Sequence, residues 1–238
     1  DNSVSTLSTG LLTHVMAQEL IYTWTQGICV VVSDLAVVQG NTVNVAAASE
    51  GGNEPALDGY AAARGIGVWG SEQAQVLGND VTLDVDVDLS VSVPLILSAP
   101  ATDELVSQLF GATASGYAEG IGIRVVDCFA AMVHGNTVDV DVDVQLVATD
   151  VSASEVTQGT ALAMGILVEC CDYAQVDENV VNADAFVDQS SVEFVVDLEA
   201  SGFGLSAGLG IVLIDCSSTL VRWNAVDASG ELWLNVQE

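Results

Sequence analysis

The sequence predicts an all-β fold in which similar coils of chain stack along one axis, and three observations lead to this prediction. Half of the 238 residues are apolar but only 5% are aromatic, and such valine-rich, aromatic-poor composition favours strands. Five blocks of the chain align without a gap. Two stretches, 77–91 and 134–147, alternate aliphatic residues with carboxylates. The length suits one domain with a sizeable core, so we treat residues 1–238 as a single domain.

The five blocks share residues at fixed positions. Each begins with Gly-Ile, then has Val or Leu at position four, Ser or Cys at position seven, Val at twelve, Asn at fifteen and Val at seventeen. The blocks span residues 27–43, 65–81, 122–138, 165–181 and 210–226. Because alternate residues of a strand face the same side, the conserved aliphatic positions are expected to face one interior and to stack on their equivalents in the next coil.

The asparagine at position fifteen is expected where the chain turns a corner. Its amide can pair with the equivalent amide one coil away and can satisfy backbone groups that the bend leaves unpaired. Glycine precedes it in three copies and permits a corner with positive φ. The predicted asparagine ladder consists of Asn41, Asn79, Asn136, Asn179 and Asn224.

The residue at position seven is small, as a bend with an inward side chain requires. The predicted inward stack consists of Ser33, Ser71, Cys128, Cys171 and Cys216. We interpret its three cysteines as buried thiols, with a disulfide between neighbouring coils as the alternative, although a parallel stack does not readily offer disulfide geometry. The five cysteines form no C-x-x-C motif, so neither haem attachment nor a zinc knuckle is supported.

These blocks resemble the coils of the right-handed parallel β-helix, the pectate-lyase-like superfamily, which commonly read Gly-Ile-x-Val, a small residue, then Asn-x-Val or Asn-x-Ile. The resemblance implies a right-handed parallel β-helix, or β-solenoid, of about five large coils, and residues 1–4 look like the tail of a sixth. It is specific for architecture but not for activity, because the superfamily holds lyases, hydrolases, epimerases, phage tailspikes and adhesive stalks.

The repeat is longer than the usual coil of that superfamily. The steps from one block to the next are 38, 57, 43 and 45 residues, and the extra length follows the asparagine. Each repeat is therefore expected to contain either one coil with a long third side, a coil with an added strand or loop, or two small coils.

Carboxylates occupy the alternate positions that face away from the expected core. The two rows consist of Asp84, Asp86, Asp88, Asp139, Asp141 and Asp143. The simplest interpretation is a solvated face that blocks unwanted strand pairing. The sharper one is a diffuse, weak Ca²⁺-binding surface, because hard cations bind carboxylate oxygens. No EF-hand spacing or glycine-rich calcium nonapeptide is present, so the sequence requires no cofactor and leaves Ca²⁺ as a hypothesis.

The formal charge of −30, with three arginines and no lysine, restricts the partners. Nucleic acid and anionic membranes need basic residues, so neither is expected to bind, and a polyanionic substrate would be repelled. The longest apolar runs are far shorter than the roughly 18 residues of a membrane span, so membrane insertion is not expected. The acidity is also compatible with adaptation to high salt.

The sequence contains no recognisable catalytic motif, and no catalytic residue is assigned. Asp127, Asp172 and Asp215 could stack as a carboxylate cluster beside the corner, and His134 occupies a variable repeat position that we interpret as exposed and unspecialised. Aromatic residues could line a sugar-binding groove, although packing is the simpler explanation; they are Tyr60, Tyr117, Tyr173, Trp69 and Trp223. Enzymatic activity therefore stays uncertain and is less expected than its absence.

A structural role is the function that the sequence favours. Regular coils without a catalytic constellation suggest an exported β-solenoid that self-associates end to end as a subunit of an extracellular filament, sheath or adhesive stalk. The start at Asp1, without Met or signal peptide, fits a processed protein at the cell surface or outside the cell. The alternative is a carbohydrate-binding or polysaccharide-degrading β-helix, with glycans as partners, and it rests on fold analogy.

Overall fold

A computed structural model describes residues 3–12, 19–54, 56–92, 113–151, 156–193 and 201–237. Within these ranges the regular elements are strands, and the described chain has no helix that could span a lipid bilayer. The strands are β1 Ser3–Leu12, β2 Glu19–Val31, β3 Leu35–Gln39, β4 Thr42–Glu54, β5 Ala56–Trp69, β6 Gln73–Leu77, β7 Asp80–Ser92, β8 Thr113–Val126, β9 Ala130–His134, β10 Thr137–Val151, β11 Val156–Glu169, β12 Gln175–Asp177, β13 Val180–Glu193, β14 Ser201–Ile214, β15 Leu220–Arg222 and β16 Ala225–Gln237.

The strands form three parallel sheets. Sheet A has the order β1-β4-β7-β10-β13-β16, sheet B the order β14-β11-β8-β5-β2, and sheet C the order β15-β12-β9-β6-β3. Each repeat contributes one strand to sheet B, then one to C, then one to A, so it is a single large coil and not two small ones. The predicted right-handed parallel β-helix of about five coils is confirmed.

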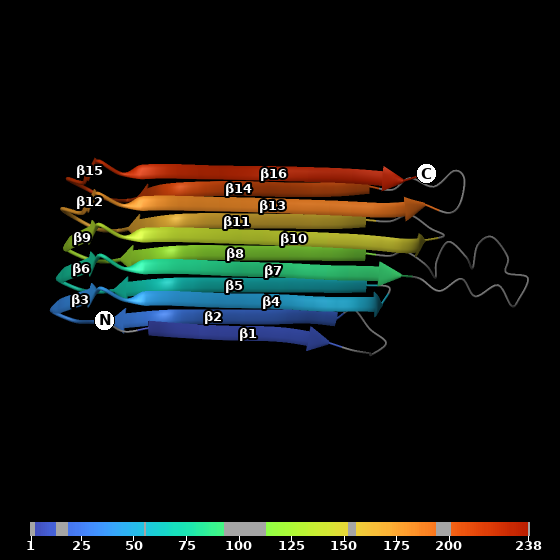
Figure 1. Cartoon of the computed structure of the whole chain (residues 1–238), viewed down its shortest axis with the longest axis horizontal. Coiled ribbons are helices and arrows are strands. Elements are labelled where there is room, and N and C mark those ends of the chain that lie inside the picture. Colours follow the sequence, from blue (N-terminus) through green and yellow to red (C-terminus); the bar gives the residue numbers. More distant parts are fainter. Residues whose placement is uncertain are drawn as a thin grey trace, which may run out of the picture.

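The extra length of each coil lies in sheets A and B, whose strands are long, while sheet C is short (Figure 1). β1 pairs with β4 from Ser3↔Thr42 onward, so residues 3–12 occupy the sheet A position of a preceding coil; Asn2 lies outside the described residues. The two-residue connection from sheet C to sheet A is constant. The connection from sheet A to sheet B varies from residue 55 alone to residues 93–112.

Neighbouring coils align residue for residue, which places equivalent side chains on one another. Val138 of β10 pairs with Val81 of β7 and Val181 of β13, and all three are buried. The same holds for Ile123, which pairs with Ile66 and Ile166. The core is a column of stacked aliphatic side chains, each contributing about 1.5–3 kcal/mol when fully buried.

Left-handed backbone makes both corners of sheet C. Position fourteen has positive φ in every block, at Gly40, Gly78, Gly135, Glu178 and Trp223, with φ between 55° and 65°. The two copies without glycine adopt the conformation at an intrinsic cost of about 1–2 kcal/mol each, which stacking on the preceding corner must offset. The other corner, at position six, also has positive φ, in residues Val32, Gly70, Asp127, Cys170 and Asp215.

The five asparagines at position fifteen lie in one file and are joined by hydrogen bonds. Asn136 donates from its main-chain N–H (3.0 Å) and its Nδ2 (2.9 Å) to Oδ1 of Asn179 in the next coil. Its Nδ2 also donates to the carbonyl oxygen of Val76 at 2.9 Å. The same contacts join the other neighbouring asparagines of the file, so each inner amide is satisfied while fully enclosed.

The small residues at position seven lie at the corner between sheets B and C. Ser71, Cys128 and Cys171 are buried, whereas Cys216 in the last coil and Ser33 in the first described coil are less enclosed. The thiols of Cys128 and Cys171 point toward main-chain carbonyl oxygens, and all five cysteines are free. The hydrogen bond with Cys128, together with burial, raises the pKa of the Cys171 thiol, which keeps it protonated and unreactive.

Replacing Asn136 by Ala tests the contribution of the asparagine file. The change leaves the buried main-chain N–H of Asn79 without its acceptor and removes the side-chain donors to the carbonyl of Val76 and to Oδ1 of Asn179, which keeps only the main-chain N–H of residue 136. The free energy of unfolding should therefore fall by about 2–4 kcal/mol. Urea unfolding followed by circular dichroism measures it. Asn182→Ala, on the outer face of β13, is the control and should cost less than about 1 kcal/mol. Equal losses would contradict a special role for the file.

Candidate functional site

The outer face of sheet A carries a grid of carboxylates. All six aspartates of the two predicted rows lie there, on β7 and β10, while the valines between them are buried. Register brings Asp84 beside Asp141, and Asp141 beside Asp184 of β13. Asp86 lies beside Asp143. Neighbouring carboxylates are separated by about 5 Å between strands and about 7 Å along a strand.

At the ends of the two rows, an aspartate of one strand does not have an aspartate of the other strand beside it. Asp139 lies between Thr82 and Asn182, and Asp88 lies beside Gln145. The Nδ2 of Asn182 donates to Asp139 Oδ1 and to Asp184 Oδ2, both at 3.0 Å. Amide donors therefore hold the edge of the grid, whereas its centre consists of carboxylates alone.

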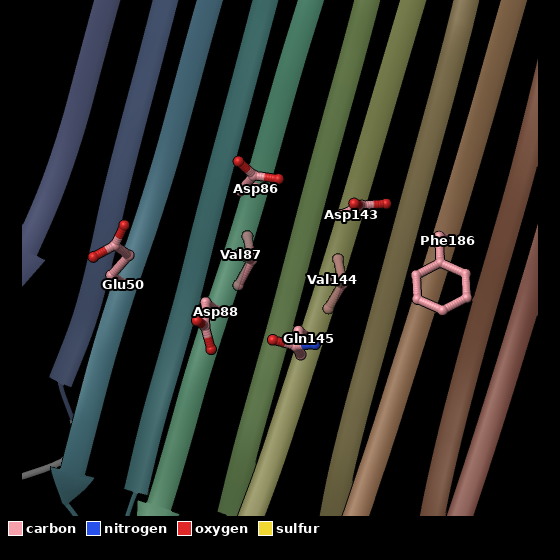
Figure 2. A pocket seen from close by; sticks show the side chains of 8 residues that line it. All are labelled: Glu50, Asp86, Val87, Asp88, Asp143, Val144, Gln145 and Phe186. Atoms are coloured by element: carbon pink, nitrogen blue, oxygen red, sulfur yellow. The ribbon is translucent and has the colours of Figure 1, made fainter.

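A shallow hollow of about 220 Å³ lies on this face (Figure 2). Glu50, Asp86, Asp88 and Asp143 place four carboxylates around it, and Val87 and Val144 form its floor. Gln145 and Phe186 complete the lining. Phe186 occupies the register position next to Asp143, where the file of carboxylates stops. Glu50 and Phe186 were not predicted from the sequence, although their spacing from the asparagines places them in these files.

Crowding changes the acidity of the central carboxylates. Partial burial, with the charges of Asp84, Asp143, Asp141 and Asp88, raises the pKa of Asp86 to about 6. Burial and neighbouring aspartates also raise the pKa values of Asp141 and Asp143. These are the shifts expected where like charges repel and no cation compensates them.

The protein's cations lie on other faces. Arg64 and Arg124 are in β5 and β8 of sheet B, and Arg222 is in β15 of sheet C. Arg124 pairs with Glu169 at 2.8 Å. Among the described residues, no three His, Cys, Asp or Glu side chains are arranged to hold a metal ion. The face is therefore a flat carboxylate array without an arginine and without a closed metal cage in the described part.

The structure corrects the interpretation of His134 as unspecialised. Its Nδ1 lies 2.9 Å from Oδ1 of Asp177 in the next coil, and Arg222 reaches Oδ2 of the same aspartate at 3.3 Å. Burial acts to raise the pKa of Asp177, but hydrogen bonds from Gln175, His134 and Arg222 outweigh it and lower the pKa. The signal was present in the sequence, because these three residues share position thirteen of their blocks.

The carboxylates suggested as a cluster beside the corner occupy two different repeat positions. Asp127 and Asp215 share the position-six corner with Cys170 between them, whereas Asp172 follows Cys171 and is hydrogen-bonded to Ser217. The three carboxylates therefore do not stack in one file.

The aromatic residues also lie apart. Tyr60 and Tyr117 stack with Tyr22 on sheet B, with ring centroids 4.8 and 5.0 Å apart and their faces against one another. Tyr173 contacts Phe129, and Trp223 lies under Arg222. Trp69 lies at the end of β5, nine residues after Tyr60 on the same strand, and the aromatic residues of the other pairs lie elsewhere, so these side chains do not line one sugar-binding groove.

Comparisons with protein-family models, with curated proteins and with solved structures found no match. The parallel β-helix architecture therefore rests on the sheet order and register of the chain itself. Membership of the pectate-lyase-like superfamily stays a resemblance of its coils.

The pH dependence of stability tests the crowding at Asp86. Its pKa rises from 3.8 to about 6 on folding, so the unfolded chain ionises first and stability falls as pH rises through this interval. Asp86→Asn removes this penalty. The variant should melt about 2–4 °C above the parent at pH 7, allowing for screening of a half-exposed group, and this gain should vanish near pH 4.

Thermal unfolding followed by circular dichroism across this pH range measures the difference. Asp188→Asn is the control, because its register neighbours are Gln145 and Trp233 and carry no charge. A gain at pH 7 as large for this control as for Asp86→Asn would contradict the assignment.

Proposed function

We propose that this chain is a structural β-solenoid that associates end to end, as a subunit of an extracellular filament, sheath or adhesive stalk. The supporting observation is the contrast between its ends and its flank. Charge is concentrated on the flank, above all on the outer face of sheet A, while the strands at the two ends of the column are nearly uncharged and expose apolar side chains.

The end of the column formed by β14, β15 and β16 carries few charges, which are Arg222 in β15 and Asp227 and Glu231 in β16. β14 contains no charged residue. Leu213, Val221 and Val226 occupy inward repeat positions that are fully buried one coil earlier, yet here each is at least 40% exposed. The outward residues Phe203 and Leu205 are apolar as well, with 67% and 54% exposure. Inward and outward side chains of this end therefore favour contact with another surface.

The opposite end has the same character on β2 and β3. Tyr22 and Trp24 of β2 are exposed, as is Val37 of β3. Glu19 is the single charged residue of β2, and β3 has none. In the described structure, neither β2 nor β3 has a neighbouring strand on this side, so both present unpaired N–H and C=O groups.

Electrostatics favours contact through the ends over contact through the sides. Two copies with a charge of −30 repel each other, and the repulsion is least when the strands with few charges meet and the acidic faces stay apart. A head-to-tail contact of this kind uses two different surfaces and does not close, so it generates open polymers.

Calcium fits this proposal as a diffuse counterion of the acidic face. A flat array of carboxylates without a closed cage should bind Ca²⁺ weakly, in the range of about 10⁻⁴–10⁻³ M typical of extracellular modules. Bound cations would reduce repulsion between copies and let filaments lie side by side. The extracellular location is part of the same proposal.

Phe203→Glu tests end-to-end association by adding a charge to the exposed end. The variant should weaken the contact at least about tenfold, because a carboxylate would be buried without a partner. Electron microscopy and sedimentation velocity, each with and without millimolar Ca²⁺, measure assembly. Gln158→Glu is the matched control, because it lies in the same outward file one coil inside and should assemble like the parent. Monodisperse parent protein under all these conditions would refute the proposal.

Carbohydrate binding is the second candidate, favoured by the hollow on sheet A. Phe186 and Gln145 stand beside the carboxylates there, a combination of an aromatic ring and polar groups that suits a sugar. The acidic surroundings restrict the ligand to neutral or cationic glycans, and enzymatic hydrolysis belongs to the same alternative.

A glycan array and a reducing-sugar assay on neutral and cationic polysaccharides test this second candidate. Any binding should fall about tenfold or more in Phe186→Ala, which removes the ring, and should persist in Tyr173→Ala, which changes an exposed ring on another face. Absence of binding and of hydrolysis across both glycan classes would remove the candidate.

A further inference from the structure

We infer that the joint between two copies forms by strand exchange: β16 of one copy replaces β1 on β4 of the next, and β14, β15 and β16 pair with β2, β3 and β4. This inference rests on the proposed end-to-end association and adds which strands meet, in which register, and which strand must leave. The partner is a second copy of this chain.

The sheets themselves require the exchange. Sheet A has one strand more than sheets B and C, because β1 lies beside β4 ahead of β2 and β3 (Figure 1). If β2 and β3 of the next copy pair with β14 and β15, then β4 arrives beside β16. That position on β4 is already held by β1. If β1 stays and pairs with β16 instead, sheets B and C are each left with a gap one strand wide.

β16 is the stronger competitor for β4. It pairs with β13 over thirteen residues, whereas β1 pairs with β4 over ten. Both have the same direction and alignment, since Val226 aligns with Val181 in the same file that joins Val4 to Val43. The exchange therefore replaces the hydrogen bonds of β1 and adds pairing for β2 and β3, which have no neighbour on this side in the described structure.

The asparagine file is polar along the axis, which fixes head-to-tail orientation. Each asparagine donates its N–H and Nδ2 to the next Oδ1 toward β16. At one end, the main-chain N–H of Asn224 has no acceptor among the described residues. At the other end, Oδ1 of Asn41 has no donor among them. In the joint, Asn224 donates to Asn41 of the next copy and the file continues.

Side chains also match across the joint when the existing register is extended by one coil. Inward, Ile211 meets Ile28 and Leu213 meets Val30. Outward, Leu205 covers the free face of Tyr22. The outward apolar residues of the two ends thus lie in the same files, although the coils between them carry polar residues there.

Site-directed cross-linking of the full chain tests the joint. Exposed Cys29 lies in the same file as Val212, so Val212→Cys should cross-link to Cys29 of the next copy with a short bis-maleimide. Cys170→Ser removes the other exposed thiol. In the competing joint, β1 stays on β4 and pairs with β16 of the other copy, which places Leu7 beside Ser229. A variant with Leu7→Cys and Ser229→Cys, in which Cys29→Ser and Cys170→Ser remove the exposed thiols, should cross-link if this joint forms.

Ladders of covalent oligomers from the Val212→Cys protein alone support strand exchange. Ladders from the Leu7→Cys/Ser229→Cys protein alone overturn it while leaving end-to-end association intact. Assembly seen by sedimentation with neither cross-link overturns it as well, and no assembly at all refutes the proposed function together with the inference.

Weakening β1 gives an independent test in the full chain. Thr6→Pro/Leu7→Pro removes two successive N–H groups, one of which faces β4, because successive groups of a strand point to opposite sides. If β1 must leave, assembly should become about tenfold faster. If β1 forms the joint, assembly should slow or stop, and this result would overturn strand exchange.

Discussion

Parallel stacking in register is the constraint on which this structure depends. The strand residues of each inner coil pair with the equivalent residues of the coils before and after it, at a separation of about 4.8 Å. A side chain must therefore be compatible with a copy of its own kind. Valine and isoleucine satisfy this requirement by dispersion and burial, and they fill the interior of the column.

Polar residues meet the same constraint with different results. Asparagine carries a donor and an acceptor, so a file of asparagines saturates itself and can be enclosed at a corner. An ionised aspartate carries hydrogen-bond acceptors but no donor, so the neighbouring carboxylates of an aspartate file repel one another. It is tolerated on the outer face of sheet A, where solvent screens the charge, but the raised pKa of Asp86 shows that screening is incomplete. One geometric rule thus gives a neutral interior and an acidic flank.

The repeat made the architecture predictable, because positions fixed in five blocks must play the same part in each coil. Asn136 and Cys128 could be placed on their files from the sequence alone. The size of the coil could not, because valine alternation shows that a strand continues but not which strand it joins. The His134–Asp177 contact was not predicted, because position thirteen was interpreted as variable. Residues at that position in successive coils lie next to one another, so a histidine followed by an aspartate indicates a contact. The left-handed backbone at Asp127 and Cys170 could not be predicted, because neither residue is a glycine. Stacking on the adjacent corners imposes this conformation.

The unequal connections from sheet A to sheet B have a consequence for engineering. The strands of sheet A end and the strands of sheet B begin along one edge of the column. The number of residues between them ranges from one, residue 55, to twenty, residues 93–112, while the sheets keep their register on both sides. Foreign peptides inserted at 55 or within 152–155 would therefore be displayed as a row of epitopes at fixed heights. The column is therefore a scaffold to which ligands, fluorophores or antigens could be attached at spacings fixed by the distance between coils.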